Sequence, residues 1–155
     1  MVAGTTVQEN VTLSIIDALR EIDGPPDYAK TLTVYRMGAN IVEVPILPCA
    51  IVLDVGCDET DSAVNGLIQC TRHFDVIVGV NSYNSDWPAQ VQAVCADIAA
   101  KLREDWTRGG YAHTTKVEFE DIWDAPSDGE QPVAGGHVSM TVVYRHHYND
   151  PTYAA

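Results

Sequence analysis

The sequence predicts an α+β domain in which two amphipathic helices pack on one face of a mainly antiparallel or mixed sheet of four or more strands. Apolar residues recur at helical spacing in two segments, residues 6–22 and the segment after Asp86. Several other segments alternate apolar and polar residues, as strands do, and are connected mainly as hairpins. The 155 residues suit one such domain, residues 1–155, with a single core.

The first helix is expected over residues 6–22. Thr5 or Thr6 can accept a hydrogen bond from a free backbone N–H at its start. Residues 24–26, Gly-Pro-Pro, end it because proline has no backbone N–H to donate. The apolar stripe that would face the sheet is formed by Val11, Ile15, Leu19 and Ile22.

Four strands are predicted in the first half of the chain. Two short ones are expected at residues 32–36 and 41–44. Residues 50–55 form a compact apolar run, and residues 68–80 alternate apolar with polar side chains over a longer stretch than any other segment. We expect the last two segments to pair as an antiparallel hairpin.

The segment inside that hairpin, residues 57–65, is polar and acidic, with Asp58, Glu59 and Asp61. It is expected to be an exposed connection that closes in a turn at residues 65–66. These acidic residues lack the spacing of an EF-hand loop and its downstream glutamate. A solvated acidic loop is therefore favoured over a calcium site.

The second helix is expected to begin after residues 85–86, with Pro88 in its first turn, and to end before the glycines at 109–110. Asp97 and Lys101 are four residues apart and are expected to pair on its surface. The apolar stripe of this helix is formed by Val91, Val94, Cys95, Ile98 and Leu102.

The rest of the chain is predicted to hold two further strands, at residues 115–123 and 137–148. Between them, residues 125–136 read APSDGEQPVAGG, a composition typical of a flexible loop. A short C-terminal tail is expected at residues 149–155.

The charge balance is the strongest deviation in composition. Nine Lys and Arg residues face 22 Asp and Glu residues, a formal net charge of -13. A surface this negative repels phosphate backbones, so specific nucleic-acid binding is not expected. The sequence has no apolar run of about 18 residues, the length that spans a bilayer. Its start lacks the pattern of a secretory signal, so a cytoplasm-like compartment is expected.

No set of residues typical of catalysis, metal binding or cofactor binding is apparent, so neither an enzyme nor a cofactor is expected. His146 and His147, near Asp150, come closest to a metal site, but neighbouring side chains on a strand point to opposite faces. Zinc sites usually draw on closely spaced pairs of ligands. Such pairs are missing among the cysteines, which are Cys49, Cys57, Cys70 and Cys95.

Three segments resemble the tail terminator (tail completion) proteins of long-tailed bacteriophages. They are the helix start DWP at residues 86–88, LREDWTRGGYAHTT at 102–115, and the closing strand VSMTVVYRHHYNDP at 138–151. With the opening amphipathic helix, they extend the resemblance over most of the chain in outline. Two features lie outside it, the long proline-rich segment 32–48 and the four cysteines.

The resemblance implies a virion protein that forms a homohexameric ring on the end of the tail tube. Such a ring stops tube polymerisation and offers a surface to head-completion or neck proteins, while DNA passes through without specific binding. It implies a place in the tail or neck of the virion, and in the host cytoplasm during assembly. The alternatives are another neck or connector subunit, such as a head-closure or tail-tube protein, and a small metal- or thiol-dependent enzyme.

Trp106, Arg108 and Tyr111 are the candidate subunit-interface residues, because exposed aromatic side chains and arginine are favoured at protein contacts. The alternative is that Trp106 and Tyr111 cover the end of the core. The acidic residues at 58, 59 and 61 are expected to face the lumen of the ring or the tube.

Overall fold

The computed structural model describes residues 5–36, 46–61, 66–81, 83, 85–124 and 133–154. The elements in chain order are α1 (Val7–Arg20), β1 (Thr33–Arg36), β2 (Cys49–Asp61), β3 (Leu67–Asn81), α2 (Trp87–Glu104), β4 (Thr114–Asp124), β5 (Val133–His147) and β6 (Asp150–Ala154).

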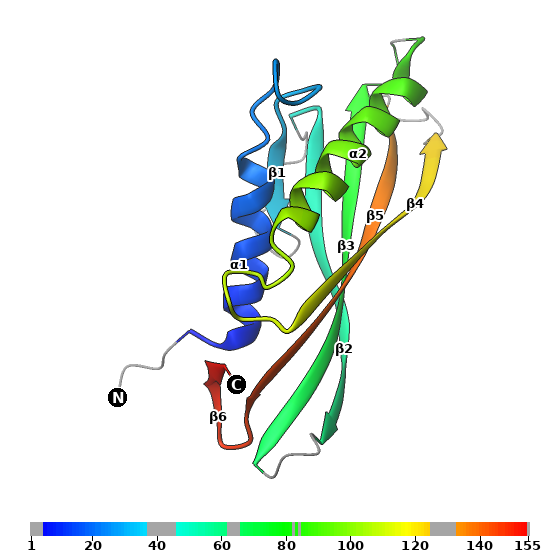
Figure 1. Ribbon diagram of the computed structural model, residues 1–155. Helices are drawn as coiled ribbons and strands as arrows, with labels where there is room; N and C mark the ends of the chain where they lie inside the picture. The colour runs from blue at the N-terminus through cyan, green and yellow to red at the C-terminus, as the bar shows by residue number, and fades with distance from the viewer. Residues whose placement is uncertain are drawn as a thin grey trace.

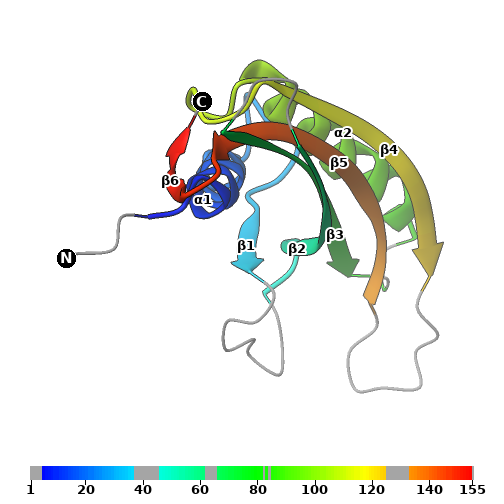
Figure 2. The same cartoon turned by 90° about the horizontal axis from the view of Figure 1, so that it is seen from below.

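The six strands form one mixed sheet, in the order β1-β2-β3-β5-β4, with β6 added to β5. β1 runs parallel to β2, and all other neighbours are antiparallel. α2 packs on β3, β5 and β4, while α1 packs on β1, β6 and α2. Figure 1 shows both helices in front of the sheet, and Figure 2 shows the sheet curving around them. The predicted fold class is confirmed.

α1 begins where the sequence predicts, because Thr6 Oγ1 accepts a hydrogen bond from the backbone N–H of Glu9 (3.1 Å). The helix turns a continuous apolar stripe to the core. Past its end the chain reverses at Gly24, where φ is 99° and a side chain would meet Thr31. The buried residues of the stripe are Val7, Val11, Ile15, Ile16 and Leu19.

α2 begins with Pro88 in its first turn, as predicted. The predicted pair between Asp97 and Lys101 is wrong. Lys101 Nζ instead lies 2.6 Å from a carboxylate oxygen of Glu21 and 2.9 Å from one of Glu104. Asp97 accepts a hydrogen bond from the backbone N–H of Ala29 (2.8 Å). Glu104 is a local partner on α2 itself, whereas Glu21 and Ala29 come from the end of α1 and the segment after it, so tertiary contacts compete with the local spacing.

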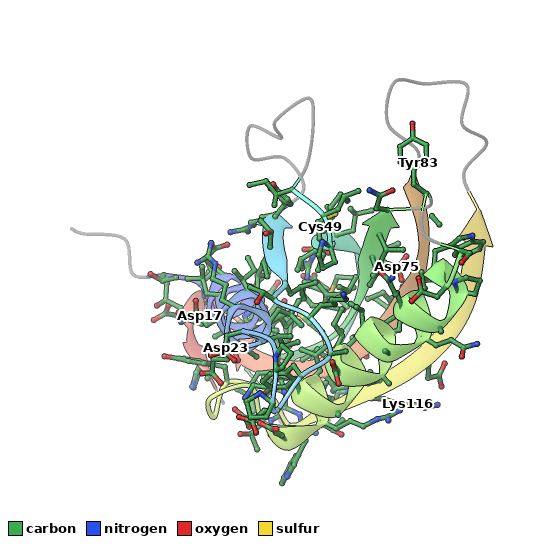
Figure 3. The ribbon with its side chains drawn as sticks, turned by 90° about the horizontal axis from the view of Figure 1, so that it is seen from above. Asp17, Asp23, Cys49, Asp75, Tyr83 and Lys116 are labelled. Atoms are coloured by element: carbon green, nitrogen blue, oxygen red, sulfur yellow. The ribbon has the colours of Figure 1, made fainter. Side chains whose placement is uncertain are left out.

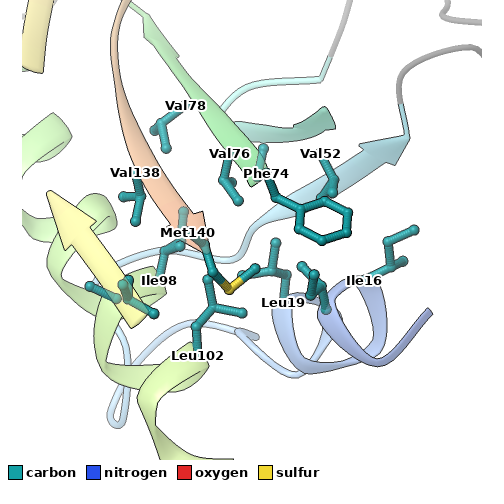
Figure 4. Close-up of a cluster of buried hydrophobic side chains, with 14 of the residues drawn as sticks. Ile16, Leu19, Val52, Phe74, Val76, Val78, Ile98, Leu102, Val138 and Met140 are labelled. Carbon is teal, nitrogen blue, oxygen red and sulfur yellow. The ribbon is translucent and has the colours of Figure 1, made fainter. Parts of the chain in front are cut away.

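The core lies between the helices and the inner face of the sheet. Alternate residues of β3 and β5 point inward, so the period-two pattern of the sequence becomes the buried face. Phe74, only 1% exposed, points from β3 toward α1, and Met140 points from β5 toward the helices (Figure 4). Further buried side chains on these two strands are Cys70, Val76, Val78, Val80, Val138, Val142 and Tyr144.

Three segments predicted as loops or tail are strands. Residues 57–61 continue β2, because β3 is long enough to pair with all of them. Residues 133–136 open β5 and pair with β3 and β4. The tail forms β6, which pairs with β5 at His146 and His147. The strand predicted at 41–44 lies outside the described residues, as does the loop at 125–132.

A bidentate ion pair fastens α1 to β1. Arg36 Nη1 donates to Glu9 Oε1 (2.6 Å) and Nη2 donates to Oε2 (2.7 Å). This hydrogen bonding with Arg36 holds the pKa of Glu9 below its ordinary value. Both side chains are partly exposed, so solvent screening reduces what the pair contributes to stability.

Replacement of Glu9 with glutamine is expected to lower the free energy of unfolding by about 0.5–1 kcal/mol at neutral pH. Because the folded-state pKa is lowered, the contribution is complete above the unfolded value of about 4.3 and disappears as the pH falls through the folded value. Urea unfolding at neutral pH and in acid measures this change. Asp17→Asn, at an exposed pair 3.9 Å apart, is the control with little effect. A Glu9→Gln effect undiminished in acid would contradict this explanation.

Candidate interaction surfaces

A tight turn connects α2 to β4, and Asp105 organises it. Its Oδ1 accepts hydrogen bonds from the Thr107 N–H (3.0 Å) and hydroxyl (2.7 Å), and its Oδ2 accepts one from the Gly109 N–H (2.7 Å). The bond from the Thr107 side chain is the main reason that the pKa of Asp105 is lowered. Three successive φ angles are positive: 50° at Arg108, 71° at Gly109 and 89° at Gly110. Glycine adopts this region at no steric cost, so the Gly-Gly pair suits the turn.

Trp106 and Tyr111 lie at the surface of this turn, with 57% and 38% of their area exposed. The carbonyl of Trp106 accepts a hydrogen bond from the Thr115 hydroxyl of β4 (2.9 Å), which ties the turn to the sheet. Trp106 therefore projects from the core rather than covering its end, while Tyr111 is partly covered. Exposed aromatic side chains on a fixed backbone are typical of protein contacts, because little conformational entropy is lost on binding.

Arg108 does not join them, and the prediction of an exposed arginine is wrong. Its side chain is fully buried, and Nη2 donates to the carbonyls of Leu102 and Asp105 at the end of α2. These carbonyls lie at the end of the helix, where regular intrahelical partners run out, and the helix dipole favours a cation there. Burial lowers the pKa of Arg108. Arg108 thus acts as a cap inside the turn that presents Trp106 and Tyr111.

A cavity of about 310 Å³ lies between α1 and α2, next to the turn that connects α2 to β4. Four of its lining residues are acidic, and Lys101 forms ion pairs with two of these. The surface beside the turn is therefore negative, which favours a partner with basic side chains. The acidic lining residues are Asp17, Glu21, Glu104 and Asp105.

The two edges of the sheet differ. Among the described residues, β4 pairs only with β5 and β1 pairs only with β2. β4 has a bulge between Phe119 and Asp121, and Lys116 and Glu118 form an exposed ion pair on it (2.6 Å). Lys116 points away from the body of the protein in Figure 3. Bulges and edge charges discourage unspecific strand pairing, so a contact here would be made by side chains.

The outer face of the sheet carries no helix of the described chain and is largely polar. The Ser139 hydroxyl donates to Asp75 Oδ1 (2.9 Å), and the Thr141 hydroxyl lies 3.3 Å from His73 Nδ1. Ile51 and Ile77 are opposite each other on this face and are half-buried. An antiparallel sheet can leave one such face to water.

Asp58, Glu59 and Asp61, which were predicted to form one acidic loop, lie on β2, where successive side chains point to opposite faces of the sheet. Asp58 lies on the outer face, 3.4 Å from His73 Nε2. Glu59 lies on the inner face, where it is opposite Cys70. Asp61 pairs through its backbone with Ile68, and its side chain is outside the described part of the chain. Asp58 and Glu59 therefore do not form one acidic face.

One cluster was missed from the sequence: Cys57, Glu59 and Cys70 bring a ligand atom each to within 4.8 Å of one another. The only signal was the i, i+2 spacing of Cys57 and Glu59, which share a face only if that segment is a strand. Three of the cysteines are buried, namely Cys49, Cys70 and Cys95. Burial raises the pKa of the Cys95 thiol to about 11. A buried thiol of this kind behaves as a small apolar residue.

No protein-family model matches this chain, and no curated protein matches it. Neither helix in the described ranges combines the length and apolar character needed to cross a membrane.

Proposed function

We propose that this protein is a bacteriophage virion subunit that forms a ring on the end of the tail tube, stops tube polymerisation and provides the surface for head–tail joining. The observation that carries the proposal is the fixed turn that presents Trp106 and Tyr111. This turn lies within LREDWTRGGYAHTT, the segment with the clearest resemblance to tail terminators. Its partners would be further copies of the chain, the tail-tube protein and the head-completion proteins.

The arrangement of the sheet supports assembly into a ring. A ring of identical subunits needs two different surfaces on each copy, because each contact is head-to-tail. The edges β4 and β1 lie on opposite sides of the sheet (Figure 2) and differ in length and charge. They are candidates for two such surfaces. The bulge and the edge charges of β4 discourage pairing with another strand. The exposed aromatic side chains lie in the turn just before β4.

The charge of the chain supports the passage of DNA. A net charge of -13 on each subunit makes the assembled ring strongly acidic. Carboxylates in the lumen would repel the phosphate backbone, so that DNA moves through without binding. The same charge limits unspecific association of subunits, which leaves assembly to the specific contacts.

Sedimentation velocity and electron microscopy of the purified protein test the proposal. We expect closed rings of one size, in an equilibrium with monomer that depends on concentration. Long filaments would favour the alternative of a tail-tube subunit, because a tube protein continues to add copies. A protein that stays monomeric at every concentration would contradict both assembly roles.

A further inference from the structure

We propose that Cys57, Glu59 and Cys70 bind a divalent metal ion that prefers thiolate ligands, with zinc as the best candidate. The three residues come from two neighbouring strands, Cys57 and Glu59 from β2 and Cys70 from β3. They lie on the inner face of the hairpin, on the side of the helices. The proposal goes beyond the assembly role and does not depend on it.

A β-bulge creates the cluster. Before it, Val52 is buried against the helices, and residues of β2 at even positions point inward. Between Asp54 and Gly56 the register with β3 shifts by one residue, which reverses the phase of the strand. Cys57 and Glu59, which are at odd positions, therefore point to the inner face. With unbroken alternation they would point outward, away from Cys70.

The distances are close to those of a metal site. The three ligand atoms lie within 4.8 Å of one another, and Cys70 Sγ is 3.9 Å from Glu59 Oε1. Ligands of a tetrahedral zinc ion with bonds of about 2.0–2.3 Å are roughly 3.3–3.8 Å apart. Small rotations of the side chains would close this difference. Two thiolates select zinc or a similarly soft ion over magnesium or calcium.

The cluster brings together two thiols and a carboxylate, which are all anionic when ionised. Burial, together with the nearby Cys57, raises the pKa of the Cys70 thiol to about 11. Arg72 is the neighbouring cation on the inner face, but its Nη1 is 2.6 Å from Asp54 Oδ2 and is engaged there. A divalent ion in the cluster would favour the ionised thiols over the neutral ones, because it stabilises the thiolates and the carboxylate at once.

A disulfide between Cys57 and Cys70 fits the geometry less well. Cys57 is directly opposite Arg72, so Cys70 is its diagonal neighbour. Diagonal neighbours in an antiparallel pair have Cα atoms about 7–8 Å apart, at or beyond the limit of about 7 Å for a disulfide. A metal ion accommodates the wider spacing because it lies between the sulfur atoms.

An adjoining cavity of about 180 Å³ leaves room for a fourth ligand. Glu59, Tyr144 and His146 line it, and Thr6 and Gln8 close it from the start of α1. Figure 1 shows the β2–β3 hairpin extending past this end of the helix. His146 Nδ1 lies 2.8 Å from the carbonyl of His147, so Nδ1 is the donor, which leaves Nε2 of the neutral ring as the nitrogen that could bind a metal ion. This is the tautomer of metal-binding histidines, and either His146 or water would complete the site.

Zinc and cobalt binding to the purified, reduced protein tests the proposal. Equilibrium dialysis with elemental analysis is expected to give one tightly bound zinc ion per chain. Cobalt in its place should show the intense near-ultraviolet absorption of thiolate-to-metal charge transfer. Cys57→Ser and Cys70→Ser should each weaken zinc binding by more than about 100-fold. Removal of a residue that only orients a ligand typically costs about 10- to 100-fold, so a larger loss indicates a direct ligand. Glu59→Gln should weaken it while leaving the charge-transfer band.

Cys95→Ala is the matched control, since it removes a buried thiol of α2 that is not part of the cluster and should change neither zinc affinity nor the cobalt band. Circular dichroism checks that each variant is folded, and the exposed position of Glu59 makes its variant the safest for the fold. Absence of a tightly bound ion, or equal loss in Cys95→Ala, would overturn the proposal. A Cys57–Cys70 disulfide in protein purified without reductant, with no metal uptake after reduction, would also overturn it.

Discussion

Replacement of both Trp106 and Tyr111 with alanine is expected to break the proposed ring into monomers while each subunit stays folded. Exposed aromatic side chains at the centre of an interface commonly contribute about 2–4 kcal/mol to binding. Loss of that amount raises the dissociation constant of each contact by roughly 30- to 700-fold. The subunit should stay folded because Trp106 is 57% and Tyr111 38% exposed, so neither belongs to the core.

Sedimentation of the double variant, at a concentration where the unmodified protein is expected to form the proposed ring, measures this effect. Tyr83→Ala is the matched control, because Tyr83 is 79% exposed and lies beyond the other end of α2 (Figure 3). We expect it to form rings as the unmodified protein does. If the double variant still forms the full ring, these residues are not the interface. If both variants dissociate equally, the loss is not specific to this turn.

Replacement of Phe74 with alanine is expected to have the largest effect on stability. Phe74 is 1% exposed and packs in the core between β3 and α1 (Figure 4). Truncation of a buried phenylalanine costs about 3–5 kcal/mol, because it removes apolar contacts and leaves a cavity. This is a large fraction of the roughly 5–15 kcal/mol that stabilises a typical domain.

Urea unfolding measures the loss as a lower transition midpoint. Ile77→Ala is the control on the same strand, since Ile77 points to the outer face and is half-buried. Its cost is expected to be about 1 kcal/mol, as for most substitutions outside a packed core. Equal losses at positions 74 and 77 would show that the outer face is also packed, and would contradict an uncovered sheet face in the single chain.

Local signals gave most of the fold. Thr6 and Pro88 mark the starts of both helices because caps depend on a few neighbouring residues. The period-two pattern at 68–80 marks β3 for the same reason. The mistakes occurred where distant parts of the chain decide the structure. Residues 57–61 look like an acidic loop, yet they form a strand because β3 continues beside them. Lys101 finds Glu21, which no spacing along α2 could indicate.

The candidate sites show the same division. The position of Trp106 beside a glycine turn left two possibilities, an exposed contact residue or a cover over the end of the core, and the structure has it 57% exposed. Arg108, two residues later, has a left-handed backbone, and its side chain lies under the end of α2. Cys57 and Glu59 meet Cys70 only because of the bulge before Gly56, and a bulge leaves little trace in the hydrophobic pattern.

The growth of tail tubes in the presence of this protein tests the central claim most directly. Tail-tube protein from the genome that encodes this chain would be allowed to polymerise with increasing amounts of the chain, and tube lengths would be measured by electron microscopy. Our account predicts that tubes become shorter as more protein is added, and that each halted end carries a ring. Unchanged tube lengths and bare ends at every ratio would contradict it.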